Sequence, residues 1–300
     1  MANSEIWTIQ KLLEWTENHF KGKNFDTPRL DAQILLAHSL QCKKIDLYVR
    51  SQEQPGEEIL AKFRQLVKQR SKGCPVAYLV GHKEFYQLDF LVDQSVLIPR
   101  PETEFLVIEA LKLIQTMQKN GIEKPKILDL ATGSGIIAIS IAQQIKKATL
   151  IATDLSQEAL AIAQKNAEKN QVSEQIEFLQ GNLFEALSSQ RTETESPFFH
   201  MILSNPPYVT REEYELLDAE VKEFEPKIAL FAGEDGLDFY REIANQAKNH
   251  LHPKGNLILE IGAKQATAVC ELLKSAQWEN IRQINDGNRI IRVISAQKSA

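Results

Sequence analysis

The chain has 300 residues, of which 43% are hydrophobic and 25% charged, and its formal net charge is −5. This length suits one large or two ordinary globular domains. The composition provides enough apolar residues for a hydrophobic core that needs no disulfide bond or metal ion to stabilise it. The acidic balance argues against a protein that holds duplex DNA mainly through its phosphates.

The cysteines and the first apolar stretch predict the compartment. Cys42, Cys74 and Cys270 are widely spaced and odd in number, and no CxxC pair or Cys/His cluster accompanies them. Neither a disulfide framework nor a metal site is therefore expected. Charges interrupt the apolar stretch within residues 1–15, unlike a signal peptide, and no apolar run reaches the roughly 18 residues of a membrane span. We expect a cytoplasmic protein with no membrane partner.

Residues 1–73 form the first predicted domain, a helical bundle. Apolar residues recur at about 3.6-residue spacing in residues 6–15, in a helix that Pro28 opens, and in a helix from Glu57 to Arg70. Residues 74–95 form a connector, in which the partly alternating EFYQLDFLVD, residues 84–93, predicts a short strand or hairpin.

Residues 96–300 form the predicted catalytic domain. It opens with VLIPRPETE, in which Pro99 and Pro101 fix an extended backbone around Arg100, and a helix is expected from near Glu102. Beyond Gly121, apolar strands alternate with helices, so the fold class is α/β with a parallel sheet covered on both faces. The predicted strands are residues 125–130, 148–154, 175–180, 198–204, 255–262 and 288–295, and the polar residues 188–196 predict a surface loop.

The stretch ILDLATGSG, Ile127 to Gly135, runs from a strand through a glycine turn into a helix. Gly133 and Gly135 allow a ligand to approach the backbone closely. The third glycine of a dinucleotide motif is missing, because Ala138 stands there, and Asp129 would repel phosphates. These features disfavour a dehydrogenase and suit S-adenosylmethionine, which carries a sulfonium and no phosphate.

Two further strand ends supply nucleoside-binding groups. Asp154 closes the second strand and is placed to accept hydrogen bonds from ribose hydroxyls. Asn182 and Leu183 follow the third strand, where they can bond the edge of an adenine and pack on its face. Because the carboxyl ends of parallel strands meet at one edge of the sheet, we expect these groups to share a site.

The tetrapeptide Asn205-Pro206-Pro207-Tyr208 ends the fourth strand at the same edge. Methyl transfer to a planar NH2 group requires that both N–H bonds be directed, because the nitrogen lone pair is delocalised. The Asn205 side-chain oxygen and the Pro206 carbonyl can accept those two hydrogens, and Tyr208 offers a flat face for stacking. Both acceptors bind more strongly as the nitrogen becomes cationic, which favours the transition state.

The glycine loop, Asp154 and the Asn-Pro-Pro-Tyr tetrapeptide together resemble class I methyltransferases that modify planar nitrogens. LIPRPETE, PVAYLVGHKEFYQLDF, FEPKIALFAGEDGLDFY and GNRIIRV resemble, more narrowly, the HemK-type (PrmC) peptide chain release factor glutamine N5-methyltransferases. The resemblance covers nearly the whole chain. It implies a Rossmann-like, seven-stranded methyltransferase domain that follows a helical substrate-recognition domain, and a substrate glutamine in the Gly-Gly-Gln loop of class I release factors.

The resemblance also assigns residues. Asn205, Pro206, Pro207 and Tyr208 would hold the glutamine amide, and the cofactor residues would be Asp129, Ala131, Thr132, Gly133, Ser134, Gly135, Asp154, Asn182, Leu183 and Asn205. Two positions depart from the family pattern, which commonly has an acid at Asn182 and glycine or cysteine at Ala131. Arg100, Glu102 and Glu104 are expected to shape the pocket mouth, and Glu260 and Arg289 are candidate buried structural partners.

Several other functions are open to this sequence. The nearest alternative is a ribosomal-protein glutamine N5-methyltransferase, although the IPRPETE sequence argues against it. A nucleic-acid adenine-N6 methyltransferase uses the same tetrapeptide, but needs a way to extrude the base, and the chain has no obvious target-recognition region or basic stripe. A non-catalytic nucleoside-binding protein would have no need of the tetrapeptide.

Overall fold

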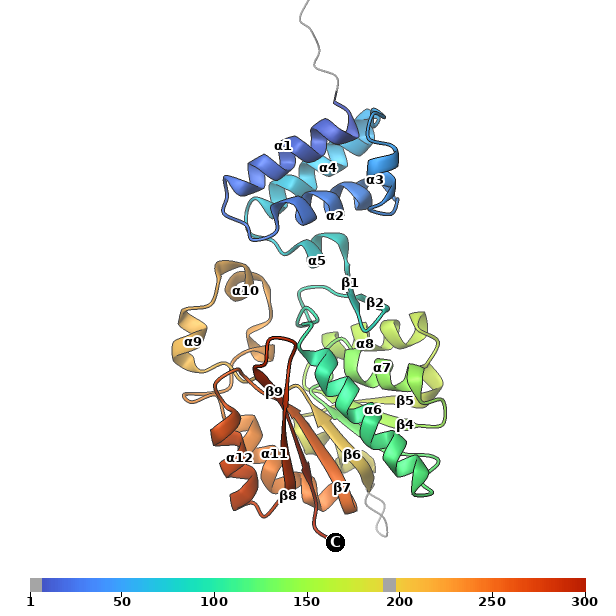
Figure 1. Ribbon diagram of the computed structural model, residues 1–300, viewed down its shortest axis with the longest axis vertical. Coiled ribbons are helices and arrows are strands. Elements are labelled where there is room, and N and C mark those ends of the chain that lie inside the picture. The colour runs from blue at the N-terminus through green and yellow to red at the C-terminus, as the bar shows by residue number, and fades with distance from the viewer. Residues whose placement is uncertain (1–6, 191–197) are drawn as a thin grey trace, which may run out of the picture. The chain divides into compact units, whose positions relative to one another are not determined.

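The computed structural model describes residues 7–190 and 198–300 (Figure 1). The chain divides into two compact units, one of residues 1–82 with residues 218–224, and the other of residues 83–217 with residues 225–300. The functional boundaries at residues 73 and 95 remain predictions. Within the described ranges, no helix combines the length and the apolar character that crossing a membrane requires.

The first unit is helical. It contains α1 (Ile9–Lys21), α2 (Pro28–Leu40), α3 (Asp46–Val49), α4 (Glu57–Arg70) and α5 (Val76–Val80). The predicted start of α2 and both predicted ends of α4 are confirmed, whereas α3 and α5 are too short to show a helical period. Phe20, Leu35, Leu36 and Leu47 are fully buried between the helices, as their apolar spacing requires.

The buried Arg70 joins the distant segment 218–224 to this unit. Its Nε donates to Asp31 Oδ2 over 2.8 Å, and its Nη1 donates to Glu220 Oε2 over 2.6 Å. The guanidinium also lies over the Phe25 ring, 3.9 Å from the ring centroid. Two carboxylates and an aromatic face therefore compensate a charge whose side chain is only 6% exposed.

The second unit begins within β1 (His82–Phe85), at Lys83, and β1 forms a hairpin with β2 (Leu88–Leu91). Tyr86 and Gln87 form its two-residue turn with φ of 48° and 62°, the positive values that a twisted hairpin needs. The predicted hairpin is confirmed. After the proline-rich segment, α6 (Thr103–Lys119) begins one residue beyond the predicted start.

A seven-stranded sheet forms the centre of this unit, in the order β5-β4-β3-β6-β7-β9-β8. The strands are β3 (Lys126–Leu130), β4 (Thr149–Asp154), β5 (Ile176–Gln180), β6 (Phe199–Ser204), β7 (Leu251–Glu260), β8 (Glu279–Asn285) and β9 (Ile291–Gln297). Strands β3 to β7 are parallel, and β9 is antiparallel to both β7 and β8.

The expectation of an all-parallel sheet is wrong for β8 and β9, and β8 itself was not predicted from the residues. The sequence of β8, ENIRQIN, is mostly polar because this strand lies at the sheet edge and is largely exposed. The predicted loop at residues 188–196 is also partly wrong. A 3-10 helix, η2 (Leu183–Gln190), continues to Gln190, and residues 191–196 lie outside the described part of the chain.

Helices cover the two faces of the sheet separately (Figure 1). Ile127 of β3 packs with α6 and with α7 (Ile136–Gln144), whereas its neighbour Leu128 packs with α11 (Asp238–Gln246) and α12 (Ala266–Ser275). The remaining elements are α8 (Gln157–Lys169), η1 (Ser173–Gln175), α9 (Arg211–Glu215), α10 (Ala219–Phe224), η3 (Lys227–Ala229) and η4 (Ala247–His250).

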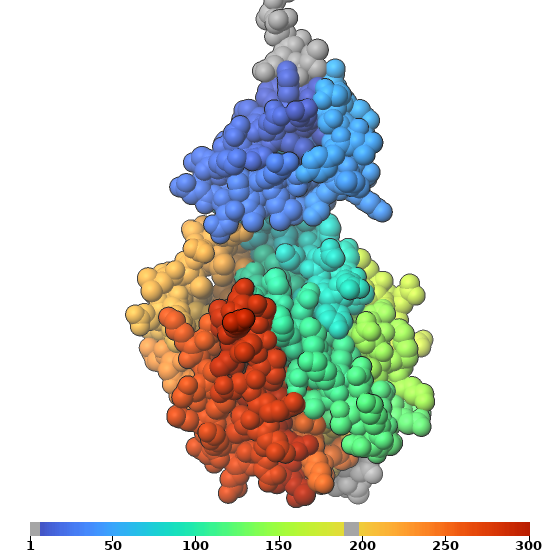
Figure 2. Space-filling view, viewed as in Figure 1, coloured from blue at the N-terminus to red at the C-terminus, as the bar shows by residue number. Residues whose placement is uncertain are grey.

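Figure 2 shows α6, in green, beside the red residues of β8 and β9 on the surface of this unit. An ion pair joins the two elements, since Arg282 of β8 donates to Glu109 of α6 over 2.5 Å. The start of α6 lies next to the carboxyl ends of the central strands, where Thr103 lines the cavity described below.

Candidate functional site

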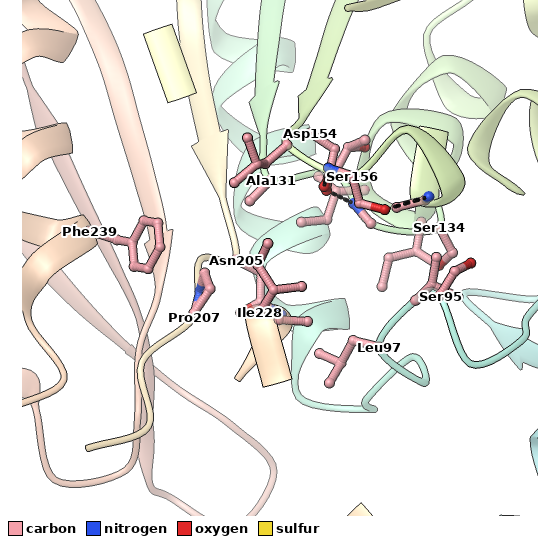
Figure 3. Close-up of a pocket in the computed structure, with 18 of the residues that line it drawn as sticks. Ser95, Leu97, Ala131, Ser134, Asp154, Ser156, Asn205, Pro207, Ile228 and Phe239 are labelled. Carbon is pink, nitrogen blue, oxygen red and sulfur yellow. Dashed lines mark hydrogen bonds between the residues drawn. The ribbon is translucent and has the colours of Figure 1, made fainter. Parts of the chain in front are cut away.

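The carboxyl ends of β3, β4 and β6 open into one cavity (Figure 3). This placement follows from the topology, because the parallel central strands all point their carboxyl ends to the same edge. Nine of the residues predicted for the site line this cavity: Ala131, Thr132, Gly133, Ser134, Asp154, Asn182, Leu183, Asn205 and Pro207. Asp129, Gly135, Pro206 and Tyr208 are not among the lining residues.

Asp129 lies beneath the glycine loop. Its Oδ2 accepts hydrogen bonds from Thr132 Oγ1, at 2.7 Å, and from the backbone N–H of Ala138, at 3.2 Å. Complete burial raises the pKa of this carboxyl to about 7, although both hydrogen bonds oppose the shift. Asp129 therefore holds the loop in shape, and its direct contact with a cofactor remains a prediction.

The glycine loop contains three residues with left-handed backbone. Ala131 and Gly133 both have φ of 56°, and Gly135 has φ of 83°. A Cβ added to Gly133 would meet no protein atom within 4 Å, whereas one added to Gly135 would lie 2.8 Å from Ile139 Cδ1 and 3.2 Å from Ala163 Cβ. Gly133 thus leaves open space on the cavity side, and Gly135 allows α7 and α8 to pack closely.

Asp154 joins the second strand to the glycine loop. Its Oδ2 accepts from the backbone N–H of Gly133 at 2.8 Å, and its Oδ1 accepts from the N–H of Ser156 at 2.9 Å. Burial raises the pKa of Asp154, and hydrogen bonds from the backbone N–H groups of Ser156, Gly133 and Leu155 oppose the rise. The Asp154 side chain also lines the cavity, where its carboxylate can accept ribose hydroxyls.

The residues of this edge suit S-adenosylmethionine. Asp154 supplies acceptors for a ribose, Gly133 leaves space against the backbone, and Asn182 offers an amide to an adenine edge. Among the described lining residues, Arg100 is the only lysine or arginine, so the site lacks the cluster of cations that a dinucleotide pyrophosphate would favour. The donor and acceptor groups therefore fit a nucleoside without phosphates.

Asn205 and Pro207 bring the tetrapeptide to the same cavity. In Figure 3, Asn205 lies beside Ile228 and Pro207, and Ala131 lies between Asn205 and Asp154 in this view. The Asn205 Nδ2 group donates to Thr103 Oγ1 at 3.3 Å. Asn205 and seven other predicted cofactor residues consequently line one space, as methyl transfer between two ligands requires.

Tyr208 is anchored next to this space rather than in its wall. Its carbonyl accepts from Gln265 Nε2 at 2.9 Å, and its ring packs with the cluster of α11 and α12. Burial raises the pKa of Tyr208 to about 12, with the neighbouring Glu260 carboxylate contributing in the same direction. The phenol therefore stays neutral, and its predicted stacking on a substrate remains a prediction.

Three polar residues that sequence reasoning missed bind the backbone or side chains in and beside the cavity wall. The buried Asn166 of α8 donates to the Ser134 carbonyl and pairs with the backbone of Leu91 through both its oxygen and its nitrogen. Gln265 bonds the carbonyls of Tyr208 and Gly236. Glu225 accepts from Arg100 at 2.5 Å and from the Ile98 N–H at 3.2 Å.

The remaining expectations for single charged residues have mixed outcomes. Arg100 lines the cavity, whereas Glu102 and Glu104 are not among the lining residues, and Glu104 instead accepts from the N–H of Tyr86. Glu260 is 1% exposed, in agreement with a buried partner. The same expectation is wrong for Arg289, which is exposed in the turn between β8 and β9.

Separate substitution of Gly133 and Gly135 should show that the first glycine leaves space for the ligand and that the second allows close helix packing. We expect Gly133→Ala to cost about 1–2 kcal/mol of stability through its backbone angle alone, and to weaken cofactor binding about tenfold or more because the new methyl group enters the cavity. Gly135→Ala should cost about 2–4 kcal/mol, since overpacking adds to the backbone strain. Thermal unfolding and calorimetric titration of each variant measure both effects, and equal changes in the two variants would contradict this assignment.

Comparison with known proteins agrees with this architecture. Residues 11–81 match the family described as PrmC N-terminal domain, and residues 109–223 match the one described as Methyltransferase small domain. The chain is 40% identical over 299 residues to a release factor glutamine methyltransferase of Rhodopirellula baltica, with 99% of both chains covered. It is 38% identical over 293 residues to a release factor glutamine methyltransferase of Geobacter sulfurreducens, with 98% of both covered.

Solved structures share the fold at lower identity. The hMettl16 catalytic domain, solved with an MAT2A 3'UTR hairpin, is 14% identical and has a TM-score of 0.54, with 78% of this chain and 83% of that chain covered. A methyltransferase from Pyrococcus furiosus is 17% identical with a TM-score of 0.50, over 73% of this chain and 92% of that chain. These two likenesses support a methyltransferase fold.

Proposed function

The chain belongs to the release factor glutamine methyltransferase family, and we propose that it transfers a methyl group from S-adenosylmethionine to the side-chain amide nitrogen of a glutamine, the one in the Gly-Gly-Gln loop of class I release factors. One observation carries the proposal at the level of the site. Asn205, whose amide suits a carboxamide substrate, lines the same cavity as Asp154 and Gly133, which suit the nucleoside.

The proposed chemistry needs little from the protein beyond orientation. When bound, S-adenosylmethionine supplies an electrophilic methyl group on a sulfonium. Asp154 and the glycine loop hold the nucleoside end, and the Asn205 oxygen and the Pro206 carbonyl each accept one N–H of the glutamine amide. Prolines 206 and 207 restrict the backbone that carries both acceptors, so little entropy is lost when the substrate is bound.

The charge that develops on nitrogen explains why no general base is needed. Both acceptors are neutral oxygens, and they bind the amide more strongly as its nitrogen becomes positive. The nitrogen is acidic only after methyl transfer, so its proton can leave to water. The neutral Tyr208 at the end of the tetrapeptide adds no competing negative charge.

The partner, the location and the role of the helical unit belong to the same proposal. We infer a release factor as the protein partner in a cytoplasmic setting, with no nucleic acid bound directly. The helical unit would contribute to recognition of the release factor, separately from the cofactor site. The family match of residues 11–81 supports this division of roles.

A labelled-methyl assay tests the proposal. Purified protein and S-adenosylmethionine with a labelled methyl group are offered a class I release factor, its Gly-Gly-Ala variant, ribosomal proteins and DNA in parallel. We expect incorporation into the release factor alone, and mass spectrometry should place the methyl group on the loop glutamine. Equal labelling of the Gly-Gly-Ala variant would refute the proposed substrate, and preferential labelling of ribosomal protein would favour the alternative glutamine substrate.

A further inference from the structure

The Asn205 carboxamide needs a means of choosing its orientation. Its oxygen and its NH2 group have nearly the same shape, and a half-turn about the last side-chain bond exchanges them. In one orientation the oxygen faces the substrate amide and accepts an N–H. In the other, two NH2 groups face each other and the substrate is repelled. The cavity shape alone cannot distinguish these states.

We propose that Thr103 and Glu260 are positioning residues that fix this orientation, with Asn205 Nδ2 held by Thr103 Oγ1 and the Thr103 hydroxyl in turn held by the Glu260 carboxylate. The Asn205 Nδ2 group donates to Thr103 Oγ1 at 3.3 Å, which turns the Asn205 oxygen the other way. This inference rests on the proposed function, because it concerns how Asn205 presents its oxygen to a substrate amide.

Thr103 alone would not be sufficient, because a hydroxyl both donates and accepts. It could accept from the Asn205 NH2 group or donate to the Asn205 oxygen. Glu260 removes this choice: an ionised carboxylate only accepts, so the Thr103 hydrogen is committed to Glu260. Among the described residues, the buried Glu260 Oε2 atom has no hydrogen-bond partner, so it is available to accept the Thr103 hydroxyl, and the nearby Thr103 side chain lowers the pKa of Glu260. The Thr103 lone pairs are then left for Asn205.

The fold holds all three residues close together. Thr103 is fully buried at the first position of α6, and its N–H donates to the Arg100 carbonyl at 3.2 Å within the proline-rich turn. Glu260 ends β7, which pairs with β6 through Ser204 and Leu259, so Asn205 and Glu260 both lie one residue past that pair. Thr103 also lines the cavity, whereas Glu260 lies behind it.

Glu260 is placed to commit Thr103 only while it is ionised. Burial raises the pKa of Glu260 to about 7, and the Thr103 hydrogen bond opposes the rise. The charged and titratable groups that interact with it are Arg292 of β9, Arg100 and Glu102 before α6, Tyr208 after β6 and Tyr240 of α11. Once protonated, Glu260 can itself donate to Thr103 and compete with the Asn205 NH2 group.

The first test is Thr103→Val, which removes the hydroxyl and keeps the shape. Methylation of the release factor at saturating cofactor should show kcat lowered about tenfold, with KM for the release factor and calorimetric cofactor affinity within about twofold of the parent. Thr103→Ser should restore most of kcat. Thr116→Val removes an exposed hydroxyl from the same helix and should change nothing.

The second test uses pH and does not depend on Thr103→Val folding well. In the parent, kcat at saturating cofactor should fall as the pH drops through about 7, because Glu260 becomes protonated. Saturating cofactor limits the contribution of Asp129, which titrates in the same range but lies under the cofactor loop. Glu260→Gln cannot titrate, so its kcat should be flat from about pH 6 to pH 8.

Three results would overturn the inference: a parental kcat in Thr103→Val, a loss that Thr103→Ser does not repair, or an acid limb of kcat that Glu260→Gln leaves unchanged. Failure of the proposed function looks different, because the parent protein itself would then leave the Gly-Gly-Gln glutamine unmethylated. The two failures are therefore separable in one set of assays.

Discussion

Asn205→Ala should lower kcat for release-factor methylation by about 100- to 1,000-fold, as removal of a transition-state hydrogen-bond partner does in other enzymes. The alanine cannot accept an N–H of the glutamine amide, so the nitrogen loses one of its two directing groups. Cofactor affinity should change by no more than a few-fold, because Asp154 and the glycine loop are untouched. Single-turnover kinetics and calorimetric titration measure the two quantities separately.

A matched substitution at the other end of the cavity gives the contrast. Asn182→Ala removes an amide of the same size from the predicted adenine turn, so it should weaken cofactor binding and leave kcat at saturating cofactor almost unchanged. If Asn205→Ala instead lost cofactor affinity to the same extent as activity, Asn205 would be a cofactor ligand only, and its role toward the glutamine would be wrong.

Asp154→Ala should weaken cofactor binding by about 100- to 1,000-fold, or ~3–4 kcal/mol, because hydrogen bonds to a charged acceptor are worth about 1.5–3 kcal/mol each. The substitution removes two ribose contacts and also frees the Gly133 N–H, which Asp154 accepts at 2.8 Å. Calorimetric titration with S-adenosylmethionine or with S-adenosylhomocysteine measures the loss, and methylation should be partly recovered at high cofactor concentration.

Glu158→Ala is the control for charge. Glu158 is an exposed acid at the start of α8, and its carboxylate accepts from the Ser156 hydroxyl, outside the cavity. The Glu158→Ala substitution removes one negative charge from the same loop region, as Asp154→Ala does. A comparable loss of cofactor affinity in Glu158→Ala would mean that the negative electrostatic potential of this loop, rather than the hydrogen bonds of Asp154, attracts the cofactor.

Much of the fold was predictable because its signals are local. The periodicity of α4 and the alternation of residues 84–93 in the hairpin depend on neighbours in the sequence, and both elements were predicted with little error. Strand β8 was missed because an exposed edge strand needs no apolar face, so its residues resemble a loop. The direction of β9 is likewise set by pairing with distant strands.

Some residues of the site could likewise be predicted from local sequence, and others could not. The tetrapeptide, the glycine loop and Asp154 are readable because each follows a strand, and the topology then gathers their positions at one cavity. Thr103 gave no such signal, and Glu260 was predicted only as a candidate buried structural partner. Their roles depend on contacts between residues more than a hundred positions apart, and a threonine at a helix start or a glutamate at a strand end is ordinary by itself.

The bond between Arg70 and Glu220 spans 150 positions of the chain. A nascent polypeptide therefore exposes its first bundle long before the segment that completes it has been synthesised. Until residue 220 emerges, Asp31 is the one acid among the described residues of the bundle that forms an ion pair with Arg70, so the buried charge is less fully compensated. The helical unit consequently reaches its full stability only after much of the second unit has been synthesised. A fragment that ends near residue 90 should have a lower free energy of unfolding than the same residues in the finished protein.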